Sequence, residues 1–205
     1  MTDSHLSDRC DSMDELVKAA RTDRAAFGRL FDHFYPSIFA YCVRRLLVRA
    51  VAEDVASEVF LHAAAAIRGF SGTTEEELRR WLFRIATNEI NAELRKSIRR
   101  RQLLEQAVQM GTIKSDVATC LLETNAPIGW QDVYETLSEM TDREQSLISL
   151  RFFAGFEHKQ IAQVLEMKTG TVRVALSRAL EKLRGRLQDS STPGRTASGA
   201  PRGGQ

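Results

Sequence analysis

The stretch that most restricts how this chain can fold is residues 157–184, EHKQIAQVLEMKTGTVRVALSRALEKLR. Ile161, Val164 and Leu165 lie three and four residues apart, which predicts a short helix with one apolar face. A break at residues 167–170 follows and contains Gly170. A second apolar stripe then predicts a longer helix: Val172, Leu176, Ala179, Leu180, Leu183 and Leu187. A short helix, a tight turn with a glycine and a longer helix are typical of a helix-turn-helix that enters a DNA groove.

The charge pattern favours a local affinity for nucleic acid over a general one. The polar side of the longer helix carries Arg173, Ser177, Arg178, Lys182 and Arg184. The whole chain of 205 residues nevertheless has a net charge of only +2. We therefore expect binding to nucleic acid to come from local basic patches or to be helped by a partner.

The cysteines and histidines show no pattern of a site. Cys10, Cys42 and Cys120 are far apart, no CxxC pair occurs, and the four histidines are scattered. This spacing argues against a disulfide framework, and we expect no metal ion and no cofactor. No apolar run approaches the roughly 20 residues that a membrane span needs, and the first residues are polar and acidic. We expect a soluble, cytoplasmic protein.

The first helices are rich in aromatic side chains. Helical periodicity begins near Met13, Asp23 is a predicted N-cap, and Pro36 suits the first turn of a further helix. The aromatic positions recur at helical spacing: Phe27, Phe31, Phe34, Tyr35, Phe39 and Tyr41. A period of 3.6 favours a core, and the alternative is a platform on which nucleotides stack.

A helix predicted over residues 50–68 has an acidic outer side. Its apolar side is Val51, Val55, Val59, Phe60 and Ala63. Asp54 and Glu58 lie one turn apart on the other side, a spacing also found in metal and acid–base sites. We expect neither metal binding nor catalysis here. A solvated face and a docking face for a basic partner remain as the two interpretations.

The helix predicted after the break at residues 69–74 has a basic side. Thr74 and Glu77 form a capping box at its start. Polar residues recur at helical spacing beside Trp81: Arg80, Arg84, Asn88, Asn91 and Arg95. Arginine contacts phosphate, asparagine pairs with base edges, and an aromatic ring stacks on an unpaired base. The alternative is a solvated basic helix with Trp81 in the core.

The remaining sequence divides the chain. Residues 1–12 and 189–205 predict disordered ends, and residues 102–130, where periodicity weakens, predict a linker with a short helix at residues 103–108. Thr141 and Glu144 predict another capping box within the domain of residues 131–188. No segment alternates like a strand. The prediction is an all-α fold of two small helical domains, residues 13–101 and 131–188, joined by a flexible linker.

Taken together, these segments resemble the extracytoplasmic-function class of the sigma-70 family of transcription initiation factors. Residues 24–101 resemble the family's second conserved region, in AEDVASEVFLHA, in the glycine-containing break and in WLFRIATNEINAELRK. Residues 131–187 resemble its fourth region, from LSEMTDREQ to SRALEKLR. Each block alone resembles parts of other regulators. Both blocks in this order and at this spacing are highly specific.

The resemblance implies a subunit without catalysis that binds core RNA polymerase and directs it to promoter DNA. The implied polymerase-docking residues are Asp54, Glu58 and Phe60. The loop of residues 69–78 is implied to melt the −10 element together with Trp81, Arg84, Asn88 and Arg95. The implied −35 contacts are Lys168, Thr171, Arg173, Ser177 and Arg178. An anti-sigma factor is a further expected partner.

Two positions depart from the family's pattern. Members often carry Ser and Arg after the residue that matches Arg173, whereas this chain has Val174 and Ala175. Polar contacts are lost there, so we expect an altered −35 preference in which the valine touches a thymine methyl group. The main alternative function is a stand-alone helix-turn-helix regulator, which leaves the acidic helix and the Arg84 stripe unexplained. A metal-dependent nuclease would need clustered carboxylates and histidines.

Overall fold

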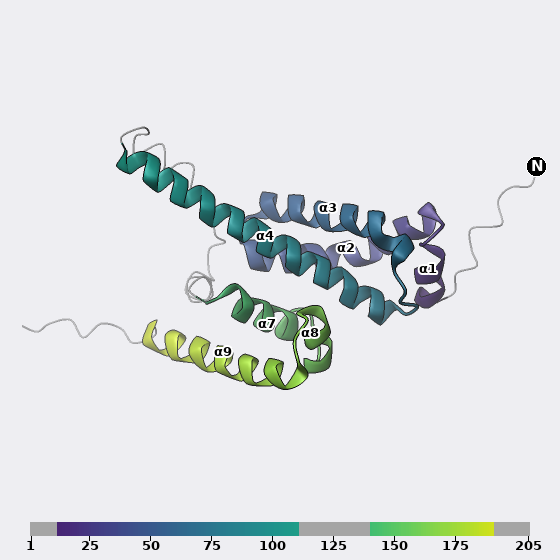
Figure 1. The fold of residues 1–205 in the computed structure, drawn as a ribbon. Helices are drawn as coiled ribbons and strands as arrows, with labels where there is room; N and C mark the ends of the chain where they lie inside the picture. The colour runs from purple at the N-terminus through teal and green to yellow at the C-terminus, as the bar shows by residue number, and fades with distance from the viewer. Residues whose placement is uncertain (1–11, 111–139, 191–205) are drawn as a thin grey trace, which may run out of the picture.

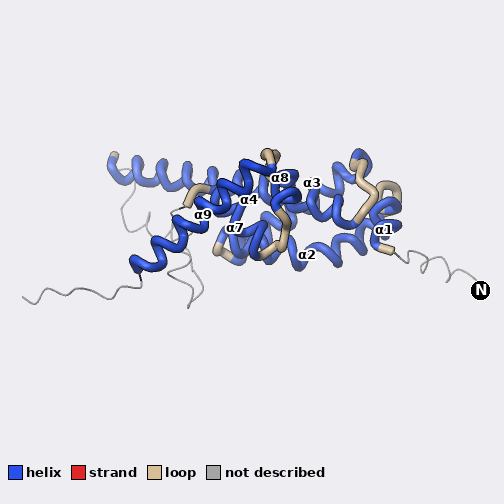
Figure 2. The backbone as a smooth tube through the Cα atoms, turned by 90° about the horizontal axis from the view of Figure 1, so that it is seen from below, coloured by secondary structure: helices blue, strands red, loops and turns tan. Residues whose placement is uncertain are grey.

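The computed structural model describes residues 12–110 and 140–190, and every regular element in these ranges is a helix (Figures 1 and 2). The first group consists of α1 (Met13–Ala19), α2 (Arg24–Leu46), α3 (Arg49–Ala66), a 3-10 turn (Ile67–Gly69) and α4 (Glu75–Gln109). The second group consists of α7 (Asp142–Phe152), α8 (His158–Val164) and α9 (Thr169–Ser190). Figure 1 shows the second group packed as a layer beneath α2 and α4. The all-α prediction is confirmed.

The predicted helix starts are confirmed by their capping bonds. The Asp23 carboxylate accepts the Ala25 N–H at 2.8 Å at the start of α2. At α4, the Glu77 N–H donates to the Thr74 hydroxyl at 3.3 Å, and the Thr74 N–H donates to the Glu77 carboxylate at 3.2 Å. Thr141 and Glu144 form the same reciprocal pair at α7. Such pairs satisfy N–H groups that have no partner inside the helix.

Pro36 lies inside α2 and does not begin a new helix. The helix is continuous over 23 residues, although a proline lacks an N–H and normally disfavours a helix interior. Phe34 and Ile38 are both buried in the same core on either side of it. The Ser37 hydroxyl also donates to the Phe34 carbonyl at 2.9 Å. The predicted break was wrong because packing on both sides of Pro36 holds one helix together.

The turn of the helix-turn-helix uses Glu166 instead of Gly170. Glu166 has a φ of 52°, in the left-handed region, and the next N–H, that of Met167, donates back to the Ala162 carbonyl at 2.8 Å. Gly170 lies in the first turn of α9. The break between the two helices covers residues 165–168, so the predicted break at residues 167–170 was displaced by two residues, and Gly170 belongs to α9 instead of the turn. A non-glycine residue in this conformation is unfavourable, so surrounding contacts must hold it.

Each group has its own apolar core. Buried side chains between α2, α3 and α4 include Leu30, Ile38, Val59, Leu82 and Ile90. Those between α7, α8 and α9 include Leu147, Leu150, Ile161, Val172 and Ala179. The two cores meet where α4 lies against α8 and α2 against α7. The α4 helix continues to Gln109, so the stretch predicted as a separate short helix belongs to it. Asp189 and Ser190, which were predicted to be disordered, are the last residues of α9. Residues 111–130 of the predicted linker and residues 1–11 and 191–205 of the predicted disordered ends lie outside the described residues.

Candidate nucleic-acid interface

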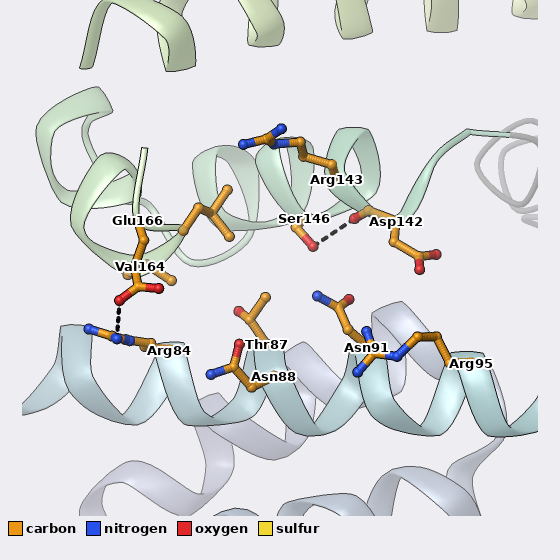
Figure 3. A pocket seen from close by; sticks show the side chains of 11 residues that line it. Arg84, Thr87, Asn88, Asn91, Arg95, Asp142, Arg143, Ser146, Val164 and Glu166 are labelled. Carbon is orange, nitrogen blue, oxygen red and sulfur yellow. Dashed lines mark hydrogen bonds and ion pairs between the residues drawn. The ribbon is translucent and has the colours of Figure 1, made fainter. Parts of the chain in front are cut away.

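The predicted basic side of α4 lines a cleft between the two groups of helices. We call Arg84, Asn88, Asn91 and Arg95 the α4 polar face. These side chains, with Thr87, form one wall of a cleft of about 270 Å³. The opposite wall comes from α7 and from the end of α8, and it includes Asp142, Arg143 and Glu166 (Figure 3). The structure thus brings three of the four predicted −10 residues together: Arg84, Asn88 and Arg95.

Within this cleft the residues differ in their partners. The Arg84 guanidinium donates to the Glu166 carboxylate across the cleft, as the dashed line in Figure 3 marks. The Asn91 amide oxygen accepts a hydrogen bond from Arg45 at 3.3 Å. Asn88 and Arg95 are exposed and make no hydrogen bond or ion pair with another described residue. The α4 polar face is therefore partly occupied by the protein itself.

Trp81 lies beside the loop that precedes α4 and outside the cleft. Its ring is half-buried and packs on Phe70, with 4.9 Å between the ring centroids. A Cβ atom on Gly72 would lie 2.4 Å from the Phe70 ring, so this close approach requires a glycine. The Arg21 guanidinium donates to the Gly72 carbonyl and fixes the loop. Neither interpretation of Trp81 was complete, because the ring contacts the core on one side and remains accessible on the other.

Arg45 is a functional candidate that the sequence pattern did not single out. It is only 4% exposed, and its guanidinium donates to the Gln145 side chain, to the Asn91 amide oxygen and to the Asp142 carbonyl. Burial lowers the pKa of Arg45, and its Nε has no hydrogen-bond partner. A signal was present in the sequence, because Arg45 follows Ile38 and Cys42 at helical spacing on the buried side of α2. A charged residue at such a position predicts a buried polar contact.

The polar side of α9 is open to solvent. We call Lys168, Thr171, Arg173, Ser177 and Arg178 the α9 outer face, and all five are exposed. Val172, Leu176 and Ala179 are buried against the other helices of the group. Figure 1 places α9 on the far side of α7 from α4. The structure thus gathers all five predicted −35 residues on one free surface, where Val174 is also 51% exposed.

The acidic side of α3 forms a third surface. Asp54 and Glu58 are exposed and pair with no other described residue; we call them the α3 acidic face. Phe60 does not reach this surface. It is only 5% exposed and packs edge-on against Phe31, with 4.8 Å between the ring centroids. In this structure Phe60 lies with Val59 in the core, beneath the α3 acidic face, and its contact with polymerase stays a prediction.

Other chemistry finds little support in the described parts of the chain. No group of three or more His, Cys, Asp or Glu side chains there is arranged to hold a metal ion. His62, one turn after Glu58, instead contacts Glu89 of α4 at 3.0 Å. Cys42 is fully buried, and this raises the pKa of its thiol to about 12, so the reactive thiolate is suppressed. None of the described helices combines the length and hydropathy of a membrane span.

Comparison with protein families defines the class to which these surfaces belong. Residues 30–101 match the model of sigma-70 region 2, which includes α3 and most of the α4 polar helix. Residues 130–183 match the model of sigma-70 region 4, which includes the helix-turn-helix. The two groups of helices are therefore two regions of one sigma-70 chain.

Similar proteins give the more particular assignment. The chain is 30% identical to the ECF RNA polymerase sigma factor SigL of Mycobacterium tuberculosis over 171 residues, covering 83% of this chain and 94% of SigL. It is 26% identical to the ECF RNA polymerase sigma factor SigW of Bacillus subtilis, covering 85% and 95% of the two chains. The chain belongs to the extracytoplasmic-function sigma factors of RNA polymerase, in the sigma-70 family.

Solved structures agree with this fold. CnrH, determined in complex with the cytosolic domain of CnrY, matches with a TM-score of 0.60 at 20% identity, over 87% of this chain and 98% of CnrH. The sigma factor RpoE of Bartonella quintana, determined in complex with the anti-sigma factor NepR, matches with a TM-score of 0.59 at 22% identity, over 79% of this chain and 96% of RpoE. At these identities the likeness concerns the fold alone.

Proposed function

We propose that this sigma factor divides transcription initiation among its three surfaces. The α3 acidic face docks on a basic surface of core RNA polymerase. The α4 polar face, with Trp81, holds the melted strand of the −10 element, and the α9 outer face reads the −35 element as duplex. The observation that carries this proposal is the presence of one acidic and two basic surfaces on separate helices of a single chain. In this proposal residues 13–101 and 131–188 are the functional domains.

The chemistry of the α4 surface suits an unpaired strand. Arg84 and Arg95 provide positive charge for successive phosphates, and Asn88 between them offers both a donor and an acceptor. Trp81 and Phe70 present accessible ring surface beside the loop that Gly72 permits. Aromatic rings bind unpaired bases by stacking, whereas bases within a duplex are already stacked. This surface therefore favours melted DNA over duplex.

The chemistry of the α9 outer face suits a duplex. The first turn of α9 presents backbone N–H groups at the positive end of a helix dipole, next to Lys168 and Thr171, which we assign to a phosphate. Arg173, Ser177 and Arg178 lie further along the same exposed side and are assigned to the major groove. Val174 is exposed among them and takes an apolar contact with a thymine methyl group.

We also propose an anti-sigma factor as a partner and the cytoplasm as the site of action. Two proteins with this fold were determined as complexes, CnrH with the cytosolic domain of CnrY and the sigma factor RpoE with the anti-sigma factor NepR. Core polymerase and chromosomal DNA, the other proposed partners, are cytoplasmic.

The direct test is reconstitution. The purified chain should co-elute with core polymerase, and the reconstituted enzyme should initiate from a distinct subset of a genomic promoter library. Sequencing of those transcripts would give both promoter elements. Failure to bind core polymerase would refute the proposal, and specific DNA binding by the chain alone as a dimer would favour the stand-alone regulator.

A further inference from the structure

The second group of helices contacts α4 through polar groups from several elements, and Arg84 is the one member of the α4 polar face that takes part in such a contact among the described residues. The Glu166 carboxylate, in the turn between α8 and α9, accepts from Arg84 of α4. The Gln160 amide of α8 donates to the Glu76 carboxylate of α4 at 2.5 Å. The Arg79 guanidinium donates to the Ala154 carbonyl in the loop after α7. Three α4 side chains spaced along two turns are thus engaged by the helix-turn-helix domain.

An apolar contact anchors the same interface. Phe156, in the loop between α7 and α8, is 0% exposed and meets Phe83 of α4 edge to face, with 5.0 Å between the ring centroids. The Arg79 guanidinium lies 4.2 Å from the centroid of the Phe156 ring. Edge-to-face rings and a cation over a ring are both attractive arrangements. The contact is therefore a packed interface, in which buried side chains support the surface ion pair.

The interface also contains a feature that limits its stability. Arg45 is buried between α2, α4 and α7 with hydrogen bonds to neutral groups only, and its Nε lacks a partner. The nearby Asp142 charge favours the guanidinium, but burial outweighs it and lowers the pKa of Arg45. A buried cation without an ion pair is unfavourable compared with the same group in water or beside a phosphate. Separation of the two groups of helices would expose Arg45 next to Asn91, on the edge of the α4 polar face. The arrangement is therefore suited to reversible opening.

Glu166 engages the Arg84 guanidinium, which is a group that can also bind a phosphate. A guanidinium pairs with carboxylate and phosphate oxygens through the same fork of N–H groups, so Arg84 cannot engage both partners fully at once. The Glu166 backbone has a φ of 52°, which is unfavourable for a residue other than glycine. A local turn would be satisfied better by glycine. The turn alone therefore does not explain a glutamate at this position, whereas the ion pair with Arg84 does.

We propose that the structure is a self-inhibited state, in which Glu166 replaces a strand phosphate on Arg84 and the α7–α8 layer excludes the melted −10 strand from α4. The α9 outer face and the α3 acidic face stay accessible in this state. The chain can therefore meet core polymerase and −35 duplex while it is closed, and it holds the −10 strand only after opening. This inference rests on the proposed function of the α4 polar face.

The test compares substitutions that open the interface with a matched charge control. Glu166→Arg repels Arg84, and Glu166→Gly removes the carboxylate while it suits the left-handed turn, so this second variant should fold at least as well as the wild type. Glu181→Arg makes the same charge change at an exposed site on α9 that pairs with no other described residue. Circular dichroism verifies folding in all three variants.

Two measurements on the free, full-length chain decide the outcome. Fluorescence anisotropy with a labelled single-stranded oligonucleotide of mixed sequence should show binding about threefold tighter for both Glu166 variants than for Glu181→Arg, because loss of an exposed ion pair lowers the population of the closed state and raises the competent fraction. Small-angle X-ray scattering should show a larger radius of gyration for the Glu166 variants. The exchange Arg84→Glu with Glu166→Arg should restore the compact form and bind the oligonucleotide weakly.

The outcomes separate this inference from the proposed function. Equal radii and equal oligonucleotide affinities for the Glu166 variants and Glu181→Arg would overturn the self-inhibited state. Opening without a gain in affinity would overturn competition between Glu166 and the strand. Failure of the wild-type chain to bind core polymerase would refute the proposed function, whereas the change in radius would still report on closure.

Discussion

The two basic helices α4 and α9 present similar chemistry in opposite environments. Both carry arginines and small polar side chains at helical spacing. The α9 outer face is fully open, whereas the α4 polar face lines a cleft with Arg84 paired to Glu166. The comparison shows that a helix with the side chains to bind DNA is not thereby free to bind it. The accessibility of its polar side chains depends on whether the helix packs against other helices on one side or on two.

The difference arises from the apolar residues of each helix. One apolar stripe of α9, which includes Val172 and Leu176, packs against the other helices of its own group. The opposite side of α9 is exposed to solvent. α4 has a wider apolar sector, because Leu82 and Ile90 pack toward α2 and α3 while Phe83 packs on Phe156 of the second group. An apolar sector broader than one stripe indicates a helix between two layers. α4 is thus both a core helix and a binding helix.

The largest effect is expected from substitutions that prevent binding to core polymerase, because neither DNA surface is then brought to the promoter. Charge reversal of the α3 acidic face, Asp54→Lys with Glu58→Lys, should weaken binding to core polymerase by about 100-fold, since opposite charges become like charges at an interface. Co-elution and titration with core polymerase measure this, and unchanged helicity provides the control. Full retention of binding would exclude the α3 acidic face from docking.

The second-largest effect is expected from a substitution on the α9 outer face alone. Arg173→Ala should reduce transcription from a cognate promoter by roughly tenfold or more, because a base-contacting arginine contributes about 1–3 kcal/mol. In vitro transcription on promoters with intact and scrambled −35 elements measures the effect. The variant and the wild type should be equal on the scrambled promoter. An equal loss on both promoters would contradict the −35 assignment.

The covered surface should respond less to the same change. Arg84→Ala should lower transcription by only about threefold, because loss of a phosphate contact is partly offset by loss of the competing Glu166 pair. The salt dependence of oligonucleotide binding should also become shallower by about one phosphate contact. Anisotropy at several salt concentrations measures this slope. An unchanged slope would show that Arg84 does not contact a phosphate.

Val174 offers a smaller test of the open surface. Val174→Ser should weaken the preference for thymine at a single −35 position, by about threefold, with little change in overall output, because only a methyl contact is lost. Transcription from a library randomised in the −35 element measures this preference. Loss of preference at several positions would mean that the substitution disturbs α9 as a whole.

The smallest effect concerns the pH dependence of stability. A hydrogen bond from the Thr141 N–H lowers the pKa of Glu144, and Lys182 of α9 contacts the same carboxylate at 3.0 Å. A depressed folded-state pKa means that this stabilisation is complete above the unfolded-state pKa, about 4.3, and is lost as the pH falls through the folded-state pKa. The loss should be below about 1 kcal/mol. Denaturant unfolding at pH 6 and pH 3 should show a smaller change for Glu144→Gln than for the wild type.

Local patterns predicted the elements, and long-range packing decided the rest. The capping residues Thr74, Thr141 and Asp23 mark helix starts because their bonds are local, so the sequence was sufficient for them. The sequence could not show that α2 runs through Pro36, because partners from other helices hold it there. The same holds for Glu166, whose left-handed turn is accompanied by a contact with a residue 82 positions away.

For the candidate surfaces, too, the sequence predicted the features that depend on one helix and missed those that depend on contacts between distant segments. Periodicity correctly placed the α9 outer face and Asp54 at the surface, because each depends on one helix and one apolar stripe. Periodicity also placed Phe60 on the apolar side of its helix, where it is buried, and only the family resemblance assigned it to docking. Periodicity gave no indication of the pairing between Arg84 and Glu166, since charge complementarity between distant segments has no local signal.

The measurement that tests the two-surface account most directly is a hydroxyl-radical footprint of the reconstituted holoenzyme on its strongest promoter, together with permanganate mapping of melted thymines. Two separate protected segments are expected, one at each promoter element. Arg173→Ala should weaken protection only upstream, and Arg84→Ala should weaken protection and melting, to a smaller degree, only in the downstream segment. A single protected segment, or loss of the same segment in both variants, would contradict the assignment of two DNA surfaces to α4 and α9.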